Sequence, residues 1–321
     1  MDGIPRNVAG NVCWEFPEPV CFKIMIPSSR WIVIRERKWN AYLAYAESLW
    51  IASGRNDLEM IGHYLKRMVD FSDDGKTLRG AYGPRIRAYN NNVADYSINT
   101  LASSVLETEN LTVDQLRFVI KCFEEDTNTR KAVIQLGDPI KDCFDSSHEK
   151  KETKDFPCTR TLHFMKDANS NRLNLMVHMR SNDLLWGASG IDIFNFTFMQ
   201  DYVARIIGLE LGCYYHIVDN FHYYDSFRPK IEAISKTELN DEPHYEYDLG
   251  FSNISEFNTG IVNLGKWEES IRKGTTPDLI DFGDDFFDDW AKVLYLFHKK
   301  TSVTFKNPIL NQIMCQEFCN G

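Results

Sequence analysis

The order of predicted strands and helices in the middle of the chain is the strongest constraint on its fold. Residues 161–165 and 173–179 alternate apolar and polar side chains, as two strands of one sheet do. A long apolar helix rich in aromatic residues is predicted at 191–208, and another strand at 214–217. Helical spacing also marks residues 39–53. Because strands and helices are mixed without regular alternation, the pattern predicts an α+β fold.

Composition limits what the chain can bind. Its 321 residues, 43% of them hydrophobic, suffice for a buried core, and no repeat or linker divides them, so we expect one domain over 1–321. A net charge of −10 argues against duplex DNA and anionic membranes as partners. Without a membrane-spanning run or a signal-peptide core, the chain is expected to be soluble and cytoplasmic. Residues 138–155, polar and charged, are predicted to form a surface excursion.

The cysteines point to a nucleophile more than to a metal. The chain has eight, with no CxxC pair and no zinc spacing, so we expect no metal site. Cys158 differs from the others because Arg160 follows it closely and Arg180 lies one predicted strand later. A guanidinium group near a thiol stabilises the thiolate, which is the nucleophilic form. This local pattern alone leaves an inert thiol as the alternative.

Several short segments, taken in their order and spacing, resemble the thymidylate synthase family and its pyrimidine-nucleotide hydroxymethylase relatives. The match is loose over the first forty residues and poor over the last sixty. The resemblance implies a large mixed sheet flanked by helices, a homodimer packed sheet to sheet, and two substrates, a pyrimidine nucleoside monophosphate and 5,10-methylenetetrahydrofolate. The segments are Glu47–Gly54, Tyr82–Arg87, Thr129–Lys131, Pro157–Cys158, Arg180–Asp183, Trp186–Asn195 and His222–Tyr224.

The resemblance implies a catalytic role for four residues. The Cys158 thiolate would add to carbon 6 of the pyrimidine, which makes carbon 5 nucleophilic toward the one-carbon unit of the folate. Arg180 would contact both the thiolate and the nucleotide phosphate. Glu47 stands in an otherwise apolar helix face and would relay protons; burial should raise its pKa. Tyr82 would assist proton removal from carbon 5.

The same resemblance implies the residues that bind the nucleotide. Arg130 and Lys131 match a basic pair that reaches the phosphate from the other subunit, so each site would need both chains. Ser181 matches a hydroxyl contact to the phosphate. His222 and Tyr224 match the pair that hydrogen-bonds the 3′-hydroxyl of the sugar.

The resemblance also implies how the folate binds, and the chain departs from the family pattern at three places besides the base-reading position. Asp183 matches the residue that binds the pterin, and Trp50 would pack near the folate or serve only the core. Thr159 stands where the family has a histidine, so a supporting hydrogen bond is lost or remade. Lys131 replaces an arginine, which exchanges a bidentate fork for a point charge. The chain ends with residues 316–321 rather than a short apolar tail, so closure over the site must differ.

The residue that reads the base decides the substrate. The family's asparagine falls at Asp192 here, after an apparent one-residue insertion. An amide satisfies both O4 and N3–H of uracil, whereas a carboxylate accepts from the amino group of cytosine, so Asp192 indicates cytosine. Asn195 is the alternative base reader and would return the substrate to dUMP. A third interpretation makes Asp192 a cap for the helix that opens at Ile193.

These observations predict folate-dependent 5-hydroxymethylation of a cytidine monophosphate, with CMP placed before dCMP. Water rather than hydride would complete the transfer. The alternative is an atypical thymidylate synthase that methylates dUMP. A catalytically inactive nucleotide- or RNA-binding relative is a third reading, disfavoured by the presence of Cys158 and Arg180 and by the acidic charge.

Overall fold

A seven-stranded mixed sheet forms the centre of the computed structural model, which describes residues 3–8, 10–90, 92–100, 112–238, 243–248, 250–275 and 278–318. The strand order is β1-β2-β7-β6-β5-β4, and β3 also pairs with β7. β6 and β7 are parallel, and every other pair is antiparallel, which confirms the predicted mixed sheet. The strands are β1 (Ile4–Val8), β2 (Asn11–Glu15), β3 (Val20–Ile24), β4 (Val133–Gln135), β5 (Thr159–Lys166), β6 (Arg172–Asp183) and β7 (Glu210–Tyr224).

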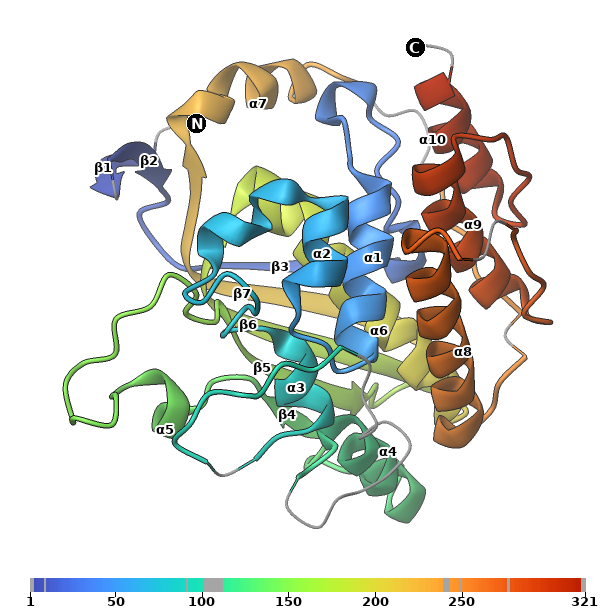
Figure 1. Cartoon of the computed structure of the whole chain (residues 1–321), viewed down its shortest axis with the longest axis horizontal. Coiled ribbons are helices and arrows are strands. Elements are labelled where there is room, and N and C mark those ends of the chain that lie inside the picture. The colour runs from blue at the N-terminus through green and yellow to red at the C-terminus, as the bar shows by residue number, and fades with distance from the viewer. Residues whose placement is uncertain are drawn as a thin grey trace.

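The helices gather on one side of this sheet, with α1 and α2 over its centre and α8 to α10 along one flank (Figure 1). No helix of the described ranges is long and apolar enough to cross a membrane. The helices are α1 (Ala41–Ala52), α2 (Leu58–Tyr64), α3 (Tyr82–Arg87), α4 (Gln115–Glu125), α5 (Pro139–Asp142), α6 (Ile193–Ile206), α7 (Arg228–Ile234), α8 (Ile254–Arg272), α9 (Asp285–Lys299) and α10 (Pro308–Phe318).

Helix α1 is a buried central element, and its sequence explains why. The Asn40 side chain caps its start by accepting a hydrogen bond from the Leu43 amide at 3.0 Å. Alanine, leucine and aromatic residues occupy nearly every face, so most of the helix is buried. Gly54 follows its end with a φ of +72°, a left-handed conformation that glycine adopts without a steric penalty. The helix predicted at 39–53 is therefore confirmed.

Helix α6 connects the two parallel strands and thereby positions the edge where they end. The apolar segment predicted as one helix over 191–208 begins earlier, as a π-helical turn from Leu184 to Asp192, and continues as α6. Both flanking strands are longer than predicted, since β6 extends to Asp183 and β7 to Tyr224. Alternation along these strands weakens near the ends, where polar residues replace apolar ones and hide the strand signal.

The two faces of the sheet are unequally covered by the described chain. On β5, Leu162 and Phe164 are fully buried, whereas the alternating Thr161, His163 and Met165 are only half-buried. This difference follows the two-residue period of a strand. The sheet therefore presents a second, partly exposed face opposite its helices.

The excursion predicted at 138–155 is wrong in its first part. Asp138, Lys141 and Asp142 are almost fully buried. Arg85 donates to Asp142 and Lys141 donates to Asn90, whereas Asp138 accepts from the amides of Ile140 and Lys141. Local polarity suggested exposure, but Lys141 and Asp142 are satisfied by partners distant in sequence and Asp138 by nearby backbone amides.

Candidate active site

The candidate residues meet at the carboxyl ends of the two parallel strands. Asp183 at the end of β6 lies opposite His222 on β7, and Ser181 lies on the same stretch of β6. Cys158 directly precedes β5, and its carbonyl accepts a hydrogen bond from the Arg180 amide at 2.9 Å. Such edges of α/β sheets are where ligands commonly bind. The structure therefore brings together residues that the sequence separates by more than sixty positions.

Arg180 is held beside the Cys158 thiol. Its Nη2 lies 3.6 Å from Sγ, and its guanidinium also donates to the carbonyls of Pro157 at 3.0 Å and Phe156 at 2.8 Å. Burial raises the pKa of the Cys158 thiol; Arg180 opposes that shift, and Asp192 adds to it. The guanidinium is thus fixed in place to stabilise a thiolate once one forms.

Thr159 and Tyr82 form a second link beside the thiol. The Thr159 amide and hydroxyl both donate to the Tyr82 phenol oxygen, at 3.2 and 2.9 Å. Burial raises the pKa of Tyr82 well above its usual value, so the phenol keeps its proton. The hydrogen bond expected to be lost or remade at Thr159 is made with Tyr82. Because its oxygen already accepts twice, the phenol is set to donate.

Glu47 on α1 is held by an amide rather than by a cation. Its Oε1 accepts from Asn195 Nδ2 at 3.1 Å, and Asn195 Oδ1 accepts from Ser48 at 2.6 Å. Burial, with a smaller contribution from Asp192, raises the pKa of Glu47 to about 8, in the direction the sequence predicted. Both ends of the Asn195 amide are engaged with α1, which favours Asp192 over Asn195 as the base reader.

Asp192 lies where the π-helical turn passes into α6. It has helical φ and ψ of −63° and −48° and makes no side-chain cap, so the cap interpretation is wrong. Its Oδ2 accepts instead from Asn182 Nδ2 at 2.7 Å. Burial raises the pKa of Asp192 to about 6; the bond from Asn182 opposes this shift, and Asp183 adds to it.

These groups border two adjoining cavities that share Glu47, Asp155 and Asp192. The first cavity continues to Cys158 and Tyr82. The second continues to Trp186. Three carboxyl groups thus border the space in front of the thiol. Asp155 is the member that sequence reasoning missed as a site residue, since nothing in its local pattern marks it.

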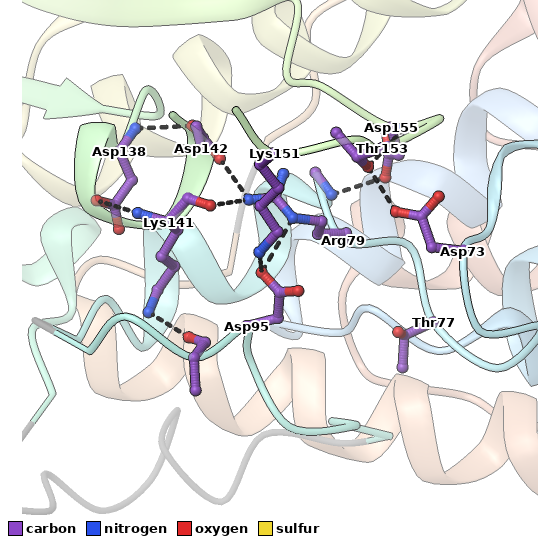
Figure 2. Close-up of polar contacts among 12 residues, drawn as sticks. Asp73, Thr77, Arg79, Asp95, Asp138, Lys141, Asp142, Lys151, Thr153 and Asp155 are labelled. Atoms are coloured by element: carbon purple, nitrogen blue, oxygen red, sulfur yellow. Dashed lines mark hydrogen bonds and ion pairs between the residues drawn. The ribbon is translucent and has the colours of Figure 1, made fainter. Parts of the chain in front are cut away.

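Asp155 is fixed by a short polar network shown in Figure 2. Its Oδ2 accepts from the Gly80 amide at 2.7 Å, and its own amide donates to the Thr153 hydroxyl at 3.1 Å. Thr153 in turn donates to Asp73 at 2.5 Å. Burial raises the pKa of Asp155. The segment that leads to Cys158 is thereby tied to the loop that precedes α3.

The second cavity has features that suit a folate. It is bordered by Trp186, whose side chain is 40% exposed and lies under the Arg67 guanidinium at 5.7 Å. Close by, Asp183 Oδ1 accepts from the Trp186 amide, while Oδ2 is buried without a hydrogen-bond partner in the described chain. An unpaired buried acceptor fits the N–H groups of a pterin. The Trp50 ring borders the first cavity, although its Nε1 donates to the Asp57 carbonyl at 3.0 Å.

The predicted nucleotide residues divide into two groups. His222 and Tyr224 lie together on β7, with ring centroids 5.4 Å apart in an edge-to-face arrangement. Arg130 and Lys131 lie just before the edge strand β4, with exposed side chains that form no hydrogen bond or ion pair to the described residues. The structure does not gather this basic pair with Cys158 in one chain. Residues 319–321 lie outside the described residues, so the expectation about closure stays a prediction.

Comparison with known proteins extends these observations. The pattern of the thymidylate synthase family matches residues 22–270. The deoxyuridylate hydroxymethyltransferase of Pseudomonas phage M6 is 30% identical over 311 residues, covering 96% of this chain and 80% of that protein. The enzyme of the same name from Bacillus phage SP01 is 36% identical over 220 residues, 68% of this chain and 53% of that protein. A thymidylate synthase of Haloferax volcanii is 25% identical over 190 residues, 58% of this chain and 52% of that protein.

Proposed function

The chain belongs to the thymidylate synthase family, and on this premise we propose that it is a folate-dependent 5-hydroxymethyltransferase acting on deoxyuridylate. One-carbon transfer to a pyrimidine nucleotide is the shared chemistry of its relatives. The observation that carries the proposal is the Cys158–Arg180 pair facing a cavity walled by Glu47, Asp155 and Asp192. The cytidylate substrate expected from the sequence is not confirmed, since the two phage relatives are named for deoxyuridylate.

The first steps follow from groups already in place. Cys158 adds to carbon 6, and Arg180 stabilises the thiolate before attack. Glu47, protonated at neutral pH, can donate toward the oxygen on which charge develops. The Tyr82 phenol, oriented by Thr159, can donate a hydrogen bond to a water molecule held near carbon 5 of the pyrimidine. When bound, the folate supplies a one-carbon unit at the oxidation level of formaldehyde.

Completion by water suits the three carboxyl groups that border the cavities. The water oxygen bonds to the exocyclic methylene carbon, and the methylene π electrons move into the ring. The bond between carbon 6 and sulfur then breaks, returning its electrons to Cys158, while the water proton passes to a carboxylate. Three carboxylates around one cavity favour a bound water, whereas hydride transfer is favoured by exclusion of water.

The raised pKa of Asp192 is compatible with uracil as the base. A neutral carboxyl offers one donor and one acceptor, the same pair that an asparagine amide offers to O4 and N3–H. With a pKa raised to about 6, the neutral form is accessible, and covering the group with a base favours it further. Cytidylate is the second candidate, because an ionised Asp192 would accept from the cytosine amino group.

Product analysis tests this proposal directly. The protein is incubated with methylenetetrahydrofolate and, separately, dUMP, UMP, dCMP or CMP, and product masses are recorded. We expect 5-hydroxymethyl-dUMP without growth of dihydrofolate absorbance. A methylated product with stoichiometric dihydrofolate would make the chain a thymidylate synthase, and hydroxymethylation of a cytidylate alone would establish the second candidate.

We also propose a homodimer with shared sites. Two features support it. A partner chain would cover the partly exposed sheet face, and the unpaired Arg130 and Lys131 would reach the phosphate in the partner's site. Mixing Cys158→Ser with Arg130→Ala should then restore up to roughly a quarter of the activity, since one site in each mixed dimer carries neither change. Mixing Cys158→Ser with Glu47→Gln is the matched control and restores nothing, because both residues act in their own chain. No recovery after verified subunit exchange would contradict shared sites.

A further inference from the structure

A buried chain of hydrogen bonds runs from the sheet core to Asp192. The Tyr214 hydroxyl lies 2.9 Å from His216 Nδ1, and His216 Nε2 lies 3.0 Å from Asn182 Oδ1. Asn182 Nδ2 completes the chain at 2.7 Å from Asp192 Oδ2. We propose that this relay of Tyr214, His216 and Asn182 determines which pyrimidine base Asp192 accepts. The inference rests on the proposed role of Asp192 as base reader.

The direction of the relay can be read from its carboxylate end. An ionised Asp192 can only accept, so Asn182 must turn its NH₂ group toward it. Asn182 Oδ1 then faces His216, which must donate from Nε2 and accept at Nδ1 from Tyr214. Burial supports this arrangement: it lowers the pKa of His216 to about 4, which leaves the ring neutral, and raises that of Tyr214 well above its usual value. Every donor in the relay therefore points toward Asp192.

Such a relay removes an ambiguity in a neutral carboxyl group. Without a partner, the proton of a carboxylic acid can sit on either oxygen, so the acid matches uracil and cytosine equally well. Asn182 donates to Oδ2 and thereby keeps the Asp192 proton on Oδ1. Donor and acceptor then occupy fixed positions. Because the two bases present donor and acceptor in opposite order, only one of them fits.

The packing shows that this contact is a built feature of the fold. Both His216 and Tyr214 are 0% exposed, and Asn182 is 5% exposed. The pair of Asn182 and Asp192 lies against the backbone of Gly187, where an added Cβ would stand 2.3 Å from Asn182 Nδ2 and 2.5 Å from Asp192 Oδ2. Residue 187 must therefore be a glycine for the contact to form. A substitution in the relay should release the Asn182 amide to turn over.

Two substitutions of His216 separate a selectivity role from a merely structural one. His216→Phe fills the space without hydrogen bonds, whereas Gln in His216→Gln can donate to Asn182 and accept from Tyr214. We expect His216→Phe to lower the ratio of kcat/KM for dUMP over dCMP by at least about tenfold. His216→Gln should keep the ratio within about threefold of wild type, even if both variants lose overall activity.

The remaining outcomes decide the matter. An unchanged ratio in folded His216→Phe protein would overturn the proposal. If that variant does not fold, Tyr214→Phe replaces it: this change removes one hydroxyl, lets His216 donate from Nδ1 or Nε2, and should shift the ratio in the same direction. An unchanged ratio in folded Tyr214→Phe protein would then overturn the relay. Failure of the proposed function is seen separately, as the absence of any hydroxymethylated product from wild-type protein.

Discussion

Two groups of buried carboxylates in this molecule have opposite environments. In the network beside α3, Asp142 is bound by Arg85 at 2.7 Å and by Arg79 at 3.1 Å. Figure 2 shows the Arg79 side of this network. Along the cavity, Glu47 and Asp192 accept from amides and have no arginine at hydrogen-bond distance in the described chain. Burial raises the pKa of the carboxylates in both groups, so the difference between their pKa values comes from their hydrogen-bond and charge partners.

The pKa values follow these partners. Burial alone would raise the pKa of Asp142, but Arg85 and Arg79 outweigh it and hold the value below its usual range. Burial raises the pKa of Glu47 to about 8 and that of Asp192 to about 6, with only amide donors in opposition. A paired carboxylate stays ionised and holds the fold together, whereas an unpaired one can exchange protons.

The largest expected effect is on the cavity side. Cys158→Ser should lower turnover at least about 10³-fold while leaving nucleotide binding intact, because an alcohol is a far weaker nucleophile than a thiol and Arg180 cannot ionise it. Turnover and equilibrium binding of the nucleotide measure the two parts. Cys143→Ser is the control, since Cys143 is exposed and should leave turnover unchanged. Substantial turnover by Cys158→Ser protein would refute the covalent route.

On the structural side, removing the cation should destabilise the fold. Arg85→Met leaves Asp142 buried with less compensation, and breaking one half of a buried pair costs about 3–5 kcal/mol. The free energy of unfolding in urea measures this loss. Lys121→Met breaks the exposed pair with Glu124 and should cost less than about 1 kcal/mol. Equal effects of the two changes would show that Asp142 does not depend on its arginine.

A smaller effect is expected at the base reader. Asp192→Asn keeps the shape, and Asn182 should hold the new carbonyl so that the NH₂ group takes the place of the protonated oxygen. Activity on uridylate should be kept or raised, and activity on cytidylate should fall, a change of roughly ten- to a hundredfold in the ratio of kcat/KM. The ratio is the measurement because a general loss of folding would lower both activities. An unchanged ratio would remove Asp192 from base reading.

The same contrast explains what the sequence could predict. Local periodicity located α1, the central strands and α6, because their burial repeats at a fixed interval. The motif around Cys158 and Arg180 pointed to the thiol and its guanidinium, which the fold places 3.6 Å apart. The burial of Asp142 and the position of Asp155 were missed. Both depend on partners more than fifty residues away, in helix α3 for Asp142 and in the loop before it for Asp155.

The relay behind Asp192 was missed for a related reason. His216 and Tyr214 read as ordinary members of a strand, and Asn182 as part of a motif whose neighbours carry the known roles. In the parallel pairing of β6 and β7, His216 lies opposite Val177. Its contact with Asn182, five residues further along β6, arises only from the packing of the folded side chains. Sequence patterns predict which face of its own strand a residue occupies. They do not predict which polar side chain of another strand it contacts.

A shift of a few degrees in Tm tests the comparison through pH. The pKa of Glu47 is about 8 in the folded protein and near 4.5 when exposed, so between these values folding retains a proton that the unfolded chain has released. Stability from this group is therefore lost as pH rises through that window. Glu47→Gln removes the titratable group and with it this loss. The Tm of the variant minus that of wild type should therefore rise by a few degrees from pH 5 to pH 8. On the other side of the comparison, the salt bridge to Arg272 and its hydrogen bond lower the pKa of Glu59, so Glu59→Gln should show a constant difference over the same range. A Glu47→Gln difference that stays flat with pH would mean that Glu47 is ionised in the folded protein and belongs with the paired carboxylates.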